Sequence, residues 1–178
     1  MTGVIDDIVL SNVGPGPDSL ALADLTVPVA PADPTTTDAV EPAHDALVLL
    51  LHRDHHAGQC RRQVRAVADR YDEFRERGCQ IVSVVPEPRS RVQEWQDRYE
   101  LPFPLCADPD TTVGDHFEQP IRFGTLGEQF DLAGRMPTAI VFDVPRVNEL
   151  EVVATYRGRT TMDRPEIDAL LATVEQRT

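Results

Sequence analysis

The segment LHRDHHAGQC, residues 51–60, holds the side chains best suited to chemistry, because it brings histidines and a cysteine close together. Cys60 stands at the predicted start of a helix, directly after a run of aliphatic residues. There the helix dipole and free backbone N–H groups stabilise a thiolate over a thiol. Positive charge lies nearby on Arg53, Arg61 and Arg62. Two interpretations follow: Cys60 is a nucleophile, or it is the first apolar residue of a helix stripe shared with Val64.

The histidines of this segment allow two further interpretations. His52, His55 and His56 together with Cys60 contain enough ligands for zinc or copper. The spacing matches no established zinc motif, so we expect neither a metal nor a cofactor and keep a His/Cys metal site as an alternative. A second role is proton exchange with the thiol by His55 or His56. We include His56 among the catalytic candidates.

A proline opens a later strand in the stretch RMPTAIVFD. We expect a cis peptide bond between Met136 and Pro137, since cis bonds in proteins are almost confined to residues that precede proline. If that strand runs antiparallel to the strand before Cys60, its start lies beside the thiol. Met136 and Pro137, with Ala57 and Gly58, would then line a groove for a substrate or partner chain.

These residues need elements to position them, and the hydrophobic pattern predicts an alternating order. Apolar runs at 46–52, 79–86 and 103–106 are typical of buried strands. Helical spacing at 58–77 and at 90–100 predicts the crossovers, and 111–117 a short helix. Strands at 138–143 and 151–158 and a helix after Asp163 follow. The order β-α-β-α-β, then β-β-α, predicts one sheet with parallel and antiparallel parts.

The two ends of the chain complete this picture. Turn formers and short apolar alternations before residue 22 predict an N-terminal hairpin, and the Pro-rich stretch 27–45 a surface loop. The final helix is expected to begin with a capping box, with Asp163 as N-cap and Glu166 closing it. We find no boundary that divides 1–178 and expect one domain.

Composition restricts the environment and the partners. Thirty acidic residues oppose 17 basic ones, all of them arginine, for a net charge of −13. Such a field repels nucleic acid and anionic membranes. The acid excess predicts a halophilic, salt-filled cytoplasm, where ions screen self-repulsion. Three irregularly spaced cysteines and the lack of a secretion signal at the N-terminus also favour the cytoplasm.

The quoted segments together resemble the redoxins of the alkyl hydroperoxide reductase/thiol-specific antioxidant family. The branch most similar carries Arg-x-x-x-Cys-x-x-Cys-x-x-Gln, and here Arg53, Cys60 and Gln63 occupy the matching places while Ala57 replaces the first cysteine. Peroxiredoxins carry Pro-x-x-x-Thr-x-x-Cys, and their later arginine falls on Pro137. The resemblance implies a thioredoxin-like α/β fold, extended by an N-terminal hairpin and an extra βα unit.

The resemblance also implies a peroxiredoxin-like, thiol-dependent oxidoreductase that reduces peroxides or protein disulfides. Cys60 would react, Arg53 would steady the thiolate, and Gln63 would orient the substrate. Cys79 and Cys106 are expected in the core, so an external thiol would complete a one-cysteine cycle. The alternative is a catalytically silent binding protein, which the alanine at position 57 favours. The sequence leaves a homodimer open.

Overall fold

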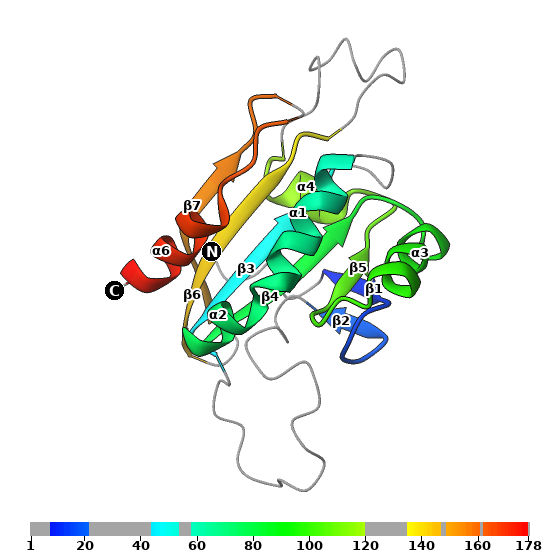
Figure 1. Cartoon of the computed structure of the whole chain (residues 1–178). Coiled ribbons are helices and arrows are strands. Elements are labelled where there is room, and N and C mark those ends of the chain that lie inside the picture. The colour runs from blue at the N-terminus through cyan, green and yellow to red at the C-terminus, as the bar shows by residue number, and fades with distance from the viewer. Residues whose placement is uncertain are drawn as a thin grey trace, which may run out of the picture.

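The described residues of the chain form one mixed sheet covered by helices on both faces (Figure 1). The structure is a computed structural model that describes residues 8–21, 44–53, 58–119, 135–146, 149–160 and 162–177. The strands are β1 (Val9–Asn12), β2 (Ser19–Ala21), β3 (Ala46–Leu51), β4 (Cys79–Val85), β5 (Leu105–Ala107), β6 (Thr138–Arg146) and β7 (Glu149–Arg157). The helices are α1 (Gly58–Asp69), α2 (Tyr71–Glu76), α3 (Arg89–Tyr99), α4 (Thr112–His116) and α6 (Ile167–Gln176).

The strand order brings three separate parts of the chain to one edge of the sheet. The order is β2-β1-β5-β4-β3-β6-β7, and β3, β4 and β5 are parallel. Strand β6 runs antiparallel to β3 with Leu51 opposite Thr138, and β7 runs antiparallel to β6 with Thr138 opposite Arg157. The end of β3, the start of β6 and the end of β7 therefore meet. We call this place the β3 carboxyl edge.

Two cores lie on opposite faces of the sheet, because side chains of a strand alternate between faces. Ala46, Val48 and Leu50 of β3 face the cluster that includes α1, α2, α3 and α6. Leu47, Leu49 and Leu51 face a second cluster with α4, which lies behind the sheet in Figure 1. Within the described ranges, none of these helices combines the length and apolarity needed to cross a membrane.

The helix expected over 58–77 is two helices, so that prediction was wrong in one respect. The apolar spacing is confirmed, with Cys60, Val64 and Phe74 all buried in one cluster. The break comes at Arg70, whose backbone (φ −114°, ψ 17°) leaves the helical region. Its guanidinium binds Glu73 and reaches Asp168 of α6 at 2.7 Å. The break thus lets Arg70 connect α2 with α6.

The capping box expected at the last helix is also absent. The helix begins at Ile167, and its N-cap Glu166 makes no side-chain hydrogen bond there. The Asp163 carboxylate instead accepts the backbone N–H of Arg159 at 2.9 Å. The segment between them stays extended and includes Pro165. The expected box fails because Asp163 caps a turn that precedes it, not the helix that follows.

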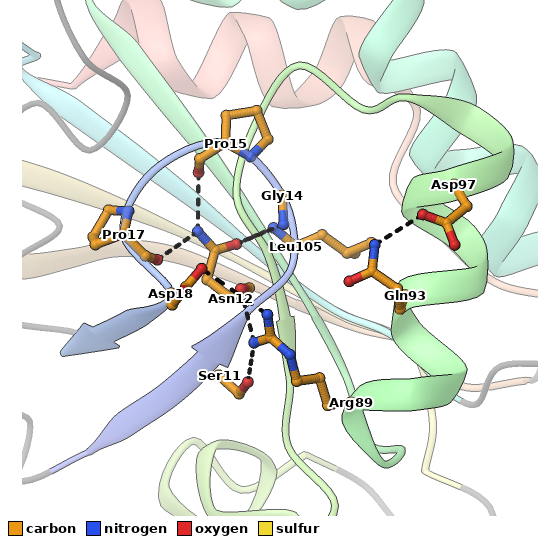
Figure 2. A network of polar contacts seen from close by, with 10 residues as sticks. All are labelled: Ser11, Asn12, Gly14, Pro15, Pro17, Asp18, Arg89, Gln93, Asp97 and Leu105. Carbon is orange, nitrogen blue, oxygen red and sulfur yellow. Dashed lines mark hydrogen bonds and ion pairs between the residues drawn. The ribbon is translucent and has the colours of Figure 1, made fainter.

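The predicted N-terminal hairpin is confirmed and is anchored by Asn12 (Figure 2). The buried Asn12 amide accepts the N–H groups of Gly14 and Leu105 and donates to the carbonyls of Pro15 and Pro17. Arg89 of α3 donates to the Asn12 carbonyl and to Ser11. These contacts join the hairpin turn to β5 and α3. A side chain that supplies both donors and acceptors is therefore needed at position 12.

Asn12→Asp is expected to lower the free energy of unfolding by about 3 kcal/mol, since it removes two buried donors and places a carboxylate against two carbonyls. Chemical denaturation at neutral pH measures the difference. Ser11→Ala is the matched control at the half-buried neighbour, where only the contact with Arg89 is lost, with an expected change of about 0.5 kcal/mol. Equal losses in both variants would show that the Asn12 network contributes little to stability.

Candidate active site

Cys60 lies in the first turn of α1, fully buried, at the β3 carboxyl edge. Its Sγ accepts the backbone N–H of Arg53 at 3.3 Å and the Nη2 of Arg164 at 2.8 Å. No acidic residue occupies the first turn of α1. A cation, a backbone N–H and a helix N-terminus all stabilise negative charge on sulfur. The sulfur is therefore held as a nucleophile would be, although it also packs in the core beside Val64.

Arg164 is the residue that sequence reasoning missed. It follows β7, 104 residues after the cysteine that it contacts. The topology contains the signal that would have found it: β7 ends at the β3 carboxyl edge, so the connection from 158 to 166 must start there. Sequence shows where this connection begins, but it does not show which of its side chains turns inward.

Close packing fixes the connection that carries Arg164. Gly158 donates its N–H to the carbonyl of Pro137 at 2.8 Å. A Cβ at Gly158 would lie 2.7 Å from the carbonyl oxygen of Asp163 and 2.8 Å from Cγ of Pro137. Glycine is therefore required for this approach, since real Cβ atoms do not come so close. The contact holds the residue next to Arg164 against the start of β6.

The predicted residues around Cys60 take different positions. Arg53 reaches the sulfur through its backbone N–H, which is a different contact from the guanidinium contact expected from the sequence. Gln63 is half-buried on α1, and the structure shows no hydrogen bond between it and Cys60. Gly58 is exposed at the start of α1, where a Cβ would make only an ordinary contact with Arg61 Nη2 at 3.8 Å. The substrate-orienting role of Gln63 stays a prediction.

Met136 and Pro137 lie at the β3 carboxyl edge, as the antiparallel pairing of β3 and β6 predicted. Both are buried. The expected cis bond between them is wrong, because no peptide bond in the described residues is cis. The chain runs on as an extended strand instead, and the Pro137 carbonyl pairs with Gly158 just beyond the pair Thr138–Arg157. The groove role of these two residues stays a prediction.

The side chain of Gln119 joins two segments at the β3 carboxyl edge. Its buried Nε2 donates to the carbonyl of Met136 at 2.8 Å and to that of His52 at 3.2 Å. Arg135 then donates to the Gln119 carbonyl and pairs with Asp115 of α4. The end of β3 and the approach to β6 are thereby joined through one amide. This support was not foreseen, because a glutamine after a short helix has no distinctive pattern.

Cys79 and Cys106 are core residues, as predicted. Burial raises the pKa of each thiol to about 12, and for Cys106 the Asp108 carboxylate adds to the shift. Cys106 belongs to the cluster with α4, whereas Cys60 belongs to the cluster on the other face of the sheet. All three cysteines are free. Cys79 shares the cluster of Cys60 but pairs with Ala46, at the other end of β3. Neither core cysteine is therefore placed to form a disulfide with Cys60.

Of the three histidines predicted at the site, the structure describes only His52. His52 is buried at the end of β3, with its ring edge against Trp95. Burial, and secondarily the charge of Arg164, lower the pKa of His52 to about 3. His55, His56 and Ala57 lie outside the described residues. Within the described part of the chain no three His, Cys, Asp or Glu residues are grouped to hold a metal. The roles of residues 55–57 stay predictions.

Comparisons with known proteins agree on one family and one fold. The model of the AhpC/TSA family matches residues 21–144. Peroxiredoxin Q of Xanthomonas campestris matches with a TM-score of 0.68 and 16% identity, over 96% of this chain and 91% of that one. Peroxidoxin BcpB of Mycobacterium tuberculosis matches with a TM-score of 0.66 and 20% identity, over 96% and 94%.

A third solved structure is the Xanthomonas campestris bacterioferritin comigratory protein, described for its alkyl peroxide reduction activity. It matches with a TM-score of 0.69 and 17% identity, over 96% of this chain and 92% of its own. No curated protein sequence matches significantly. At these identities the structural matches show the fold, and the predicted thioredoxin-like α/β class is confirmed.

Proposed function

Because the chain belongs to the AhpC/TSA family and is peroxiredoxin-like, we propose that it is a thiol-dependent peroxidase in which Cys60 is the reacting thiol. One observation carries the choice of residue: Cys60 Sγ accepts hydrogen bonds from Arg164 Nη2 at 2.8 Å and from the Arg53 N–H at 3.3 Å. A cysteine serving only to fill the core would gain nothing from a cation on its sulfur. Among the described residues, no arginine donates a hydrogen bond to the sulfur of Cys79 or Cys106, and burial raises the pKa of both thiols.

The reaction is a two-electron displacement on the peroxide. The Cys60 thiolate attacks one peroxide oxygen, the O–O bond breaks, and the sulfur becomes a sulfenic acid. The departing oxygen takes a proton and leaves as an alcohol, or as water when the substrate is hydrogen peroxide. The sulfur is oxidised and the peroxide reduced by the same two electrons. Arg164 holds the thiolate before the attack and Arg53 fixes the sulfur through its backbone.

A one-cysteine cycle completes the turnover. Cys106 lies on the other face of the sheet from Cys60, and Cys79 lies at the opposite end of β3, so neither supplies the second thiol. An external thiol condenses with the sulfenic acid to a mixed disulfide with release of water. A second external thiol then displaces Cys60 and leaves as the oxidised disulfide. The thiol returns to its starting state without a metal or cofactor.

The oxidant is a peroxide in this proposal, and a protein disulfide is the alternative. Cys60 has 0% exposed surface. A small peroxide needs much less opening around this sulfur than a protein disulfide does. The Xanthomonas campestris relative is described as reducing alkyl peroxides, which supports the same substrate class. The same burial favours the second candidate function, a silent binding protein whose cysteine belongs to the core.

The remaining sequence-based assignments are part of the proposal. Gln63 orients the substrate, and His56 exchanges a proton with the Cys60 thiol. Ala57, Gly58, Met136 and Pro137 line the groove for the substrate or partner chain. The protein works in a salt-rich cytoplasm, which its net charge of −13 and three free cysteines support. The sheet ends in the outer strands β2 and β7, and the proposal leaves a homodimer open.

The proposal is tested by trapping the oxidised sulfur. The protein in concentrated potassium chloride receives one equivalent of hydrogen peroxide and a sulfenic-acid trap, and peptide mass spectrometry then locates the adduct. The adduct is expected on the peptide with Cys60, in proportion to peroxide, and not on those with Cys79 or Cys106. An unmodified Cys60 after complete exposure would overturn the peroxidase function and favour the silent binding protein.

A further inference from the structure

The imidazole of His52 is a buried polar group that the proposed cycle has not used. Its side chain is 1% exposed, and its ring meets Trp95 edge-on with centroids 5.5 Å apart. Neither Nδ1 nor Nε2 has a hydrogen-bond partner among the described residues. Buried polar atoms in proteins are nearly always paired, so an exception needs an explanation, and a catalytic role is one of the recognised explanations.

The course of the chain and the face of the sheet place this imidazole near the proposed reacting sulfur. His52 directly precedes Arg53, whose N–H lies on Cys60 Sγ. His52 continues the alternation of β3, so its side chain lies on the same face as Leu50 and Cys60. The charge of Arg164, which also contacts the sulfur, acts on the His52 ring. The guanidinium, the sulfur and the imidazole therefore belong to one buried cluster.

The charge state of His52 limits what it can do there. Because burial and Arg164 lower its pKa to about 3, the ring is neutral at neutral pH. A neutral imidazole presents one N–H donor and one acceptor nitrogen. It therefore adds no second positive charge to compete with Arg164 for the thiolate. It does offer a fixed N–H donor inside a water-poor site, where such donors have their largest effect on developing charge.

We propose that His52 is a catalytic residue whose ring N–H donates a hydrogen bond to the departing peroxide oxygen, the one that Cys60 does not attack. The inference rests on the proposed peroxidase function. As the S–O bond forms and the O–O bond breaks, negative charge moves from sulfur to the departing oxygen. Arg164 stabilises the charge at its origin and His52 at its destination. No proton leaves the imidazole, and the departing oxygen takes its proton from solvent.

The same geometry explains why the unpaired ring is kept. A phenylalanine has nearly the same shape and would keep the edge contact with Trp95 without burying polar atoms. For stability alone, an apolar ring is the better choice at this position. A histidine here trades some stability for a donor at the site, as strained or unsatisfied groups at functional sites do elsewhere.

The test is His52→Phe, compared with the wild-type protein on a series of peroxides whose leaving alcohols differ in acidity. We expect a melting temperature equal to or above that of wild type and unchanged alkylation of Cys60 by iodoacetamide. We expect kcat/KM for peroxides to fall about 100-fold, as on loss of one preorganised donor. The fall should be largest for the least acidic leaving alcohols, so that the dependence of rate on leaving-group pKa becomes steeper.

Further variants and readouts separate the outcomes. Trp95→Phe alters the packing around the ring but keeps the donor, so its leaving-group dependence should match wild type. His52→Asn keeps an N–H donor and should retain part of the rate; if His52→Phe fails to fold, the slope of His52→Asn against wild type decides. An unchanged rate or slope on loss of the imidazole overturns the proposal. A wild-type protein that does not react with peroxide instead overturns the peroxidase function itself.

Discussion

Cys60→Ser is expected to consume no peroxide above the uncatalysed rate while it folds as well as wild type. A serine oxygen can accept the same hydrogen bonds from Arg53 and Arg164. Its hydroxyl is not ionised at neutral pH and does not become the nucleophile that a thiolate is. The rate at which peroxide is lost in the presence of a reducing thiol measures the effect. Far-ultraviolet circular dichroism checks the fold.

Cys79→Ala and Cys106→Ala provide the matched controls for this substitution. Each removes a buried thiol whose pKa of about 12 keeps it protonated, and each should keep the peroxidase rate within about twofold. Some loss of stability, about 1 kcal/mol, is expected from the small cavity that each leaves. Activity that survives in Cys60→Ser and disappears in either control would place the chemistry on another cysteine.

Arg164→Gln is expected to lower kcat/KM for peroxide about 100-fold, or ~2.7 kcal/mol of transition-state stabilisation. Glutamine can still donate to the sulfur, but it removes the positive charge beside it. The rate of Cys60 alkylation by iodoacetamide at pH 7 should fall in parallel, because both reactions depend on the thiolate. Arg164→Lys should recover part of both rates, since it keeps the charge without the planar guanidinium.

Arg159→Gln is the matched control, since Arg159 is exposed in the same connection and uses its backbone N–H for its contact with Asp163. It makes the same change of charge and should leave both rates within about twofold. Equal losses for Arg159→Gln and Arg164→Gln would show a general effect of surface charge. An unchanged rate in Arg164→Gln would show that the 2.8 Å contact to Cys60 does not serve the reaction.

The strands were predictable because their residues carry the pattern that the sheet needs. Residues 46–51 are apolar throughout, residues 79–85 are apolar except for Gln80 and Ser83, and both segments are buried on both faces. Neighbouring residues suffice to recognise such a strand. The place of Cys60 was predictable for the same reason, since a parallel strand leads directly to the helix that carries it.

The features that failed depend on contacts across the fold. Arg70 interrupts a regular apolar stripe because its guanidinium reaches Asp168 of another helix. Asp163 has the right spacing to Glu166 for a capping box, but the N–H of Arg159 occupies its carboxylate. Arg164 contacts a sulfur 104 residues away. Local patterns describe the choices open to a residue, and the tertiary contact decides among them.

Arg164 follows β7 in the chain, and this order has a consequence for protein synthesis. The ribosome releases Cys60 long before it adds the arginine that will lie against the sulfur, and α6 is added later still. A nascent chain that has already made β3 and α1 therefore carries a cysteine without its cation. A chain truncated after β7 would have every described strand of the sheet but no Arg164 beside the Cys60 thiol. The cation that holds the proposed nucleophile is therefore added only after all the described strands of the sheet.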